Sequence, residues 1–103
     1  MALSTEMHVG VCRIRFRLPE NGSLKGKRQV VKSITSRVKN KFNVSVAEVD
    51  DNDLWQAATI GISCVSNDPR HANEILSKAA DFISDGRFGI EVLDYNIEII
   101  PVF

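Results

Sequence analysis

The side chains best suited to covalent chemistry in this chain are two cysteines and two histidines. Cys12 and Cys64 form no Cys-x-x-Cys pair, and no cluster of cysteine and histidine has the spacing of a metal site. His8 and His71 are isolated, without a serine, cysteine or carboxylate at a spacing that requires a catalytic arrangement. We therefore expect no catalytic residue, no cofactor and no redox role, with both histidines at surface or edge positions.

A short acidic segment over residues 50–56 brings several carboxylates together. Asp50, Asp51 and Asp53 lack the glycine and the distal glutamate of a calcium-binding loop, so we predict no metal site. The only tryptophan, Trp55, lies in the same segment. Exposed, Trp55 would be a typical contact for a protein partner, together with Asp53 and Gln56. Alternatively, its ring folds back over the edge of a sheet and covers the core.

The charge of the chain is zero in sum but strongly polarised along the sequence. Residues 1–41 contain ten lysines and arginines against two glutamates, a balance of +8, and residues 42–103 contain three basic against eleven acidic side chains, a balance of −8. Such asymmetry is typical of a basic surface that binds nucleic acid or another polyanion. The alternative is that the two halves neutralise each other within one fold.

The elements that must position these side chains follow from the spacing of apolar residues. Alternation predicts strands over residues 7–18, 42–47, 59–64 and 92–99, and spacing of three to four residues predicts two helices. One helix begins after Ser23 and the other after Asn67 or Asp68, where Pro69 follows. In the last strand we expect Leu93 on the core side and Val92 on the other side. Cys12 and Cys64 share the core-facing parity of their strands.

This order of elements predicts one α+β domain over residues 1–103 with the ferredoxin-like arrangement β-α-β-β-α-β. Its antiparallel sheet has four strands in the order 4-1-3-2, with both helices on one face. The first and last strands are then neighbours. Arg13, Arg15 and Arg17 would share the open face of the sheet with Asp94 and Glu98, and cross-strand ion pairs would absorb part of their charge. The basic residues of the first helix have no such obvious partners.

Four stretches of the sequence resemble a known family. Residues 23–28 (SLKGKR) resemble the SLKxKR signature of the YlxP-like family of small bacterial proteins of unknown function. Residues 42–49, residues 53–56 with 58–61, and residues 65–68 match its other landmarks in order and spacing. The similarity spans residues 7–100. It implies a ferredoxin-like fold, and the frequent location of such genes beside translation genes, including those for an initiation factor and ribosome-binding factor A, suggests by analogy a role linked to RNA or the ribosome.

We therefore predict a non-enzymatic accessory protein, associated with RNA or the ribosome, whose basic surface is centred on the first helix. The open sheet face presents Ser45, Thr59, Gly61, Ser63 and Asn96 and no aromatic side chain, so contacts to the RNA backbone are expected in place of base stacking on the sheet. The expected nucleic-acid-binding residues are Lys25, Lys27, Arg28, Lys32, Lys39, Arg13, Arg15 and Arg17.

Two other function classes remain open. The first is a homodimeric protein-interaction module, which contacts its partner through residues 50–56 or packs its open sheet face against a second copy. The second is an enzyme of the acylphosphatase type, which we disfavour because residues 19–23 (PENGS) do not resemble a glycine-rich phosphate loop with a following arginine. A hydrophobic content of 44% with 25% charged residues excludes disordered and membrane classes. We expect a cytoplasmic protein without a membrane or a small-molecule substrate as partner.

Overall fold

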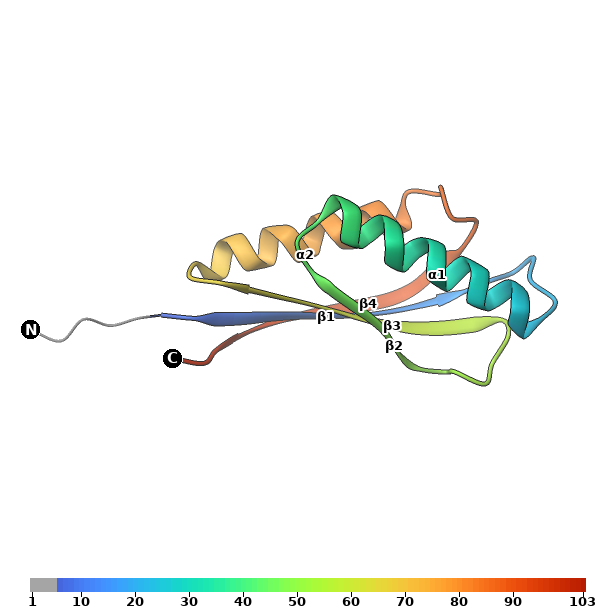
Figure 1. Ribbon diagram of the computed structural model, residues 1–103, viewed down its shortest axis with the longest axis horizontal. Coiled ribbons are helices and arrows are strands. Elements are labelled where there is room, and N and C mark those ends of the chain that lie inside the picture. Colours follow the sequence, from blue (N-terminus) through green and yellow to red (C-terminus); the bar gives the residue numbers. More distant parts are fainter. Residues whose placement is uncertain (1–5) are drawn as a thin grey trace, which may run out of the picture.

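Six elements follow one another in the predicted order in the computed structural model, which describes residues 6–103. They are β1 (His8–Arg17), α1 (Leu24–Lys41), β2 (Ser45–Asp50), β3 (Ala57–Ser66), α2 (Pro69–Ser84) and β4 (Glu91–Pro101). The antiparallel sheet has the order β2-β3-β1-β4, which is the predicted order read from the other edge. Both helices cover one face of this sheet (Figure 1). Residues 1–5 of the predicted domain lie outside the described part.

The central strand β1 follows its sequence alternation closely. Cys12, Ile14 and Phe16 are buried beneath the helices, whereas Arg13, Arg15 and Arg17 between them are exposed on the open face. Alternation of this kind places successive side chains on opposite faces of a pleated strand. β1 therefore separates a hydrophobic core on one side from a row of arginines on the other.

Both helices begin at the caps that the sequence predicts. The Ser23 hydroxyl accepts a hydrogen bond from the Gly26 amide at 3.0 Å, and the Asp68 carboxylate accepts one from the Arg70 amide at 2.9 Å. Each cap satisfies an amide that the first helical turn leaves without a partner. Pro69 occupies the first turn of α2, where its missing amide hydrogen costs nothing. The Ser23 cap therefore fixes where α1 begins after β1, and the Asp68 cap fixes where α2 begins after β3.

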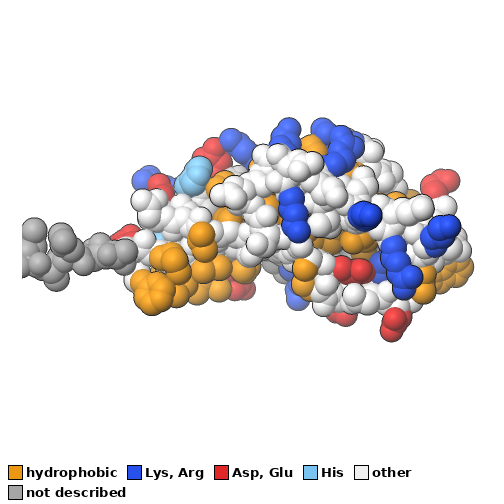
Figure 2. All heavy atoms as spheres, viewed as in Figure 1, with side chains coloured by type: hydrophobic (Ala, Val, Ile, Leu, Met, Phe, Trp, Pro, Cys, Tyr) orange, Lys and Arg blue, Asp and Glu red, His pale blue; other side chains and the backbone are white. Residues whose placement is uncertain are grey.

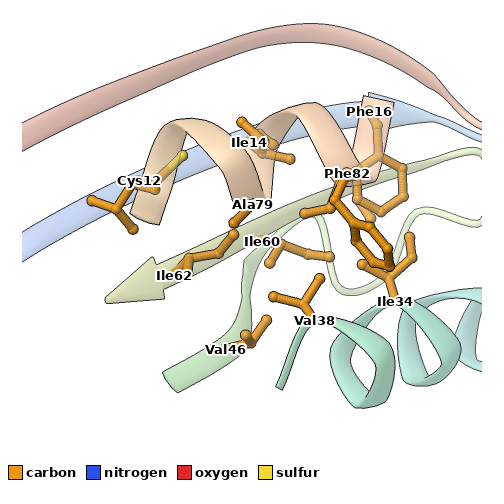
Figure 3. Close-up of a cluster of buried hydrophobic side chains, with 14 of the residues drawn as sticks. Cys12, Ile14, Phe16, Ile34, Val38, Val46, Ile60, Ile62, Ala79 and Phe82 are labelled. Carbon is orange, nitrogen blue, oxygen red and sulfur yellow. The ribbon is translucent and has the colours of Figure 1, made fainter. Parts of the chain in front are cut away.

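The core lies between the helices and the sheet, and the side chains labelled in Figure 3 converge there from both layers. Ile34 and Val38 of α1 meet Phe82 of α2, and Phe82 packs edge-to-face against Phe42 and Phe88 with ring centroids 5.9 and 5.8 Å apart. The C-terminal end of α1 packs against the same aromatic cluster. Arg37 lies 5.3 Å from the Phe88 ring centroid and Lys41 lies 5.0 Å from that of Phe82, both cation–π contacts.

One strand departs from the expected parity. The register between β1 and β4 shifts between Arg15 and Phe16, which pair with Asp94 and Val92, so Leu93 is the extra residue of a β-bulge. Our prediction for this pair was therefore wrong: Val92 packs against the core and Leu93 is exposed. A bulge reverses the parity of every residue before it, which alternation alone does not reveal.

Candidate functional site

Two loops meet at the end of the molecule opposite the chain termini (Figure 1). They are the β1–α1 loop, residues 18–23, and the β2–β3 loop, residues 51–56. The Leu18 amide donates to the Gln56 carbonyl at 2.8 Å, and the Asn21 side-chain amide donates both to the Ser23 carbonyl, at 2.7 Å, and to the Trp55 carbonyl. Hydrogen bonds thus join the β2–β3 loop directly to the residue that caps α1.

Lys27 extends from the first turn of α1 into this junction. Its exposed fraction is 1%, and its ammonium donates to the carbonyls of Leu54, at 2.6 Å, and Asp51. Its Nζ also forms an ion pair with Glu48 Oε2 at 2.8 Å, without hydrogen-bond alignment at that oxygen. A buried ammonium needs such partners, because leaving one without them costs several kcal/mol. Lys27, one of the residues expected to bind nucleic acid, is therefore buried, and it holds the β2–β3 loop against α1.

Asp51 is the second fastening point of the loop. Its Oδ2 accepts hydrogen bonds from the Thr59 hydroxyl at 2.6 Å and from Arg15 Nε at 3.1 Å. The hydrogen bond from Thr59, more than the one from Arg15, holds the pKa of the Asp51 carboxyl below its usual value. Its φ of 62° lies in the left-handed region, which Asp tolerates better than most residues. The loop therefore turns sharply at Asp51.

The eight basic residues expected to bind nucleic acid do not form one surface. Arg15 pairs with Asp51, and Arg17 pairs with Glu91 at 2.5 Å, so internal pairing absorbs part of the positive charge. The expected pairs with Asp94 and Glu98 do not occur among residues 6–103, although Asp94 stands opposite Arg15 in the register. Arg13 lies on the open face, on the other side of the sheet from α1.

Four of the eight residues remain exposed on α1. Lys25, Arg28, Lys32 and Lys39 take part in no ion pair within residues 6–103. Figure 2 shows Lys and Arg side chains spread along the side of the molecule that carries α1. We call these four residues the α1 basic surface. Lys25 and Arg28, at the start of α1, are the two residues of this surface that follow the junction of the two loops.

Trp55 is exposed beside the start of α1. Its exposed fraction is 46%, and its ring edge lies against Gly22, where Trp55 Cζ3 is 4.0 Å from the position a Cβ would take. The ring therefore does not close over the core. Asp53 and Gln56 are exposed around it. No group of three or more metal-ligating side chains occurs in the described part of the chain, and the Asp51 carboxylate is occupied by Arg15 and Thr59.

The remaining candidate residues for chemistry lie apart from this end. Burial raises the pKa of the Cys12 thiol to about 11 and also raises that of Cys64, which makes both poor nucleophiles. His71 is exposed, as expected for a surface position. His8 is half-buried at the start of β1, and its Nδ1 has no hydrogen-bond partner.

The open face of the sheet forms a shallow groove of about 540 Å³. It is lined by small side chains such as Ala47, Gly61 and Ser63, with Arg13 and Glu98 at its margins. No aromatic residue lines it, as the sequence predicts. It lies on the side of the sheet away from α1, so it and the α1 basic surface are separate.

Sequence reasoning did not find the structural role of Asn21, Lys27 and Asp51, the three residues that organise the junction. Lys27 had a readable signal: it falls in the helical stripe of Leu24, Val31, Ile34 and Val38, at a position that faces the core. A lysine in such a stripe indicates a buried ammonium with several acceptors. Asn21 and Asp51 carry no comparable signal, because their partners lie on distant elements.

These features define a ferredoxin-like α+β domain with a basic helix, α1, and with two loops joined by hydrogen bonds at the end opposite the chain termini. A family model described as "Protein of unknown function (DUF503)" matches residues 9–97. The chain therefore belongs to this family of unknown function. It is 39% identical over 75 residues to "Uncharacterized protein YlxP" of Bacillus subtilis (strain 168), a similarity that covers 73% of this chain and 82% of that protein.

Solved structures support the fold alone. The de novo designed protein Foldit4 matches with a TM-score of 0.52 at 17% identity, over 95% of this chain and 98% of the designed one. A C-terminal segment of the alpha subunit of aIF2 from Pyrococcus abyssi matches with a TM-score of 0.50 at 15% identity, over 92% of this chain and 51% of that one. Among the helices of residues 6–103, none has the length and hydropathy of a membrane-spanning segment.

Proposed function

We propose that this domain is a non-enzymatic, cytoplasmic accessory protein that binds RNA or a ribosomal subunit through the α1 basic surface. The observation that supports the proposal most strongly is the contrast between two sets of cations. Arg15, Arg17 and Lys27 have carboxylate partners within the fold, whereas the four residues of the α1 basic surface have none among residues 6–103. The positive charge left over is therefore concentrated on one helix.

This distribution suits the RNA backbone. Exposed lysine and arginine side chains bind phosphates and release condensed counterions, which makes the affinity strongly dependent on salt. α1 has 18 residues and presents Lys25, Arg28, Lys32 and Lys39 from its first turn to its last. Because α1 is fastened at one end by Lys27 and at the other by the aromatic cluster, it is a rigid element for such contacts.

Sedimentation with ribosomal particles from the protein's own cells tests this function. The wild-type chain should migrate with a subunit at low salt and dissociate at moderate salt, and Lys25→Glu with Arg28→Glu should abolish the association. The matched control is Arg70→Glu with Lys78→Glu on α2, which changes the charge equally. Absence of the wild-type chain from every ribosomal fraction, together with no binding to purified ribosomal RNA, contradicts the proposal.

A second candidate function is a homodimeric interaction module, and the groove on the open face favours it. Arg13 and Glu98 border this groove and form no ion pair among the described residues. A twofold dimer through this face would bring Arg13 and Glu98 of both copies to the interface, where opposite charges can pair. In sedimentation equilibrium the wild type and the control Asn73→Arg on α2 should dimerise, whereas Ala47→Arg in the groove should stay monomeric. A wild type that stays monomeric at high concentration contradicts this function.

A further inference from the structure

The position of Trp55 adds a specific contact to the proposed function. The ring is nearly half exposed, although tryptophan offers one of the largest apolar surfaces of any side chain. It lies beside Gly22, one residue before the cap of α1, and the Asn21 side chain bonds the carbonyls of both Trp55 and Ser23. The exposed ring and the start of α1 are thus neighbours, and hydrogen bonds join the loops that carry them.

The loop that carries the ring is held from three directions. Asn21 holds the Trp55 carbonyl, Lys27 holds that of Leu54, and the Leu18 amide holds that of Gln56. Three consecutive carbonyls are therefore fixed by the β1–α1 loop and α1. A side chain on such a loop loses little conformational freedom on binding, and this preorganisation favours recognition of a ligand.

Two carboxylates at this junction are paired within the fold, whereas Asp53 and Glu20 on the two loops are exposed and form no ion pair among residues 6–103. The Asp51 carboxylate is neutralised by Arg15, and the Glu48 carboxylate pairs with Lys27. Lys25 and Arg28 stand next to the loops, exposed and without carboxylate partners among residues 6–103. The arrangement places an exposed aromatic ring beside the start of the helix that carries these two cations, and proteins that bind single-stranded nucleic acids combine these two features.

From this arrangement we propose that Trp55 stacks on an unpaired RNA base while Lys25 and Arg28 bind the flanking phosphates. The inference rests on the proposed function and specifies its ligand as a single-stranded segment, such as a loop, bulge or strand end. The stacking residue lies on a loop, so the lack of aromatic side chains on the open sheet face does not exclude base contacts.

The fluorescence of Trp55, the only tryptophan, reports on this contact directly. The probes are a single-stranded RNA decamer, the same decamer with abasic sites, and a blunt-ended RNA duplex without a loop, each labelled for anisotropy. We expect the decamer to quench the emission. The abasic decamer and the duplex should bind more weakly and leave the emission nearly unchanged. Trp55→Leu should weaken decamer binding by about tenfold and Trp55→Phe by much less. Circular dichroism verifies that both variants fold.

The outcomes separate the two proposals. Tight binding without quenching, or equal affinity for the wild type and Trp55→Leu, overturns base stacking and leaves phosphate binding by α1 in place. Equal quenching by the intact and abasic decamers also overturns stacking. If no RNA binds the wild type, the proposed function fails as well, and Trp55 is then a candidate contact for a protein.

Discussion

Lys27 Nζ lies 2.6 Å from the main-chain carbonyl of Leu54, so a lysine of the first helical turn holds the loop that presents the only tryptophan. The same ammonium pairs with Glu48 and bonds the Asp51 carbonyl. The motif around residues 23–28 therefore combines two roles. Lys27 is structural, whereas Lys25 and Arg28 on either side of it are directed to solvent.

Lys27→Met should destabilise the fold and loosen the β2–β3 loop. The substitution keeps an apolar stem but leaves the Glu48 carboxylate and two carbonyls without their shared partner, at a cost of about 3 kcal/mol in the free energy of unfolding. Urea denaturation measures the cost, and red-shifted Trp55 emission in the folded state reports the loosened loop. Lys32→Met, exposed on the same helix, should change neither quantity. Equal stability of the two variants would show that the buried ammonium does not brace the loop.

Asp51 should make the stability of the protein dependent on acid pH. Because the hydrogen bond from Thr59 lowers the pKa of Asp51 in the folded state, its stabilisation is present above the ordinary value of about 3.9 and is lost as the pH falls through the folded-state pKa. Asp51→Asn should lower the urea midpoint at pH 6 and flatten its fall below pH 4. Asp53→Asn, which changes an exposed carboxylate, is the control. An unchanged acid slope in Asp51→Asn would refute the assignment.

The two cysteines should be unreactive in the folded protein. Burial raises the pKa of Cys12 to about 11, so this thiol forms almost no thiolate at pH 8, and burial also raises the pKa of Cys64, which makes its thiol less reactive than an exposed one. We expect a chromogenic disulfide reagent to label both thiols only at the rate of unfolding, and rapidly once urea is added. Rapid labelling of one thiol without denaturant would mean that its strand is more accessible than the structure indicates.

The β-bulge in β4 predicts opposite effects for two adjacent residues. Val92→Ala removes methyl groups packed against the core and should cost about 1 to 2 kcal/mol, whereas Leu93→Ala should change the stability by less than about 0.5 kcal/mol. Thermal or urea unfolding of the two single variants measures the difference. A larger loss of stability for Leu93→Ala would mean that β4 alternates regularly and that Leu93 lies in the core.

Local patterns were sufficient for most of the fold. Ser23, Asp68 and Pro69 mark helix starts through short-range chemistry, and the alternation of β1 defines both faces of a central strand. The bulge at Leu93 was missed because one inserted residue changes parity without changing composition. Sequence alone could therefore predict the elements and their order, but not every register.

The site was only partly predictable for a different reason. The sequence does not show which lysines and arginines are free to bind a ligand, because this depends on carboxylate partners far along the chain. Arg15 is paired with Asp51 and Lys27 with Glu48, whereas Lys25 and Arg28 are free of such pairs in the described part of the chain. The joining of Trp55 to the start of α1 depends on the Asn21 side chain, a contact between two loops that no local pattern encodes.

The most direct test of the account is the salt dependence of RNA binding by the purified domain. Anisotropy with a single-stranded RNA should give an affinity that falls steeply with ionic strength. Lys25→Glu with Arg28→Glu should weaken binding at least tenfold and reduce the slope of log affinity against log salt by about 1.4, the value for two lost phosphate contacts on a single strand. Arg70→Glu with Lys78→Glu should leave the slope unchanged. Equal losses in both double variants would mean that only net charge matters and would contradict a binding surface on α1.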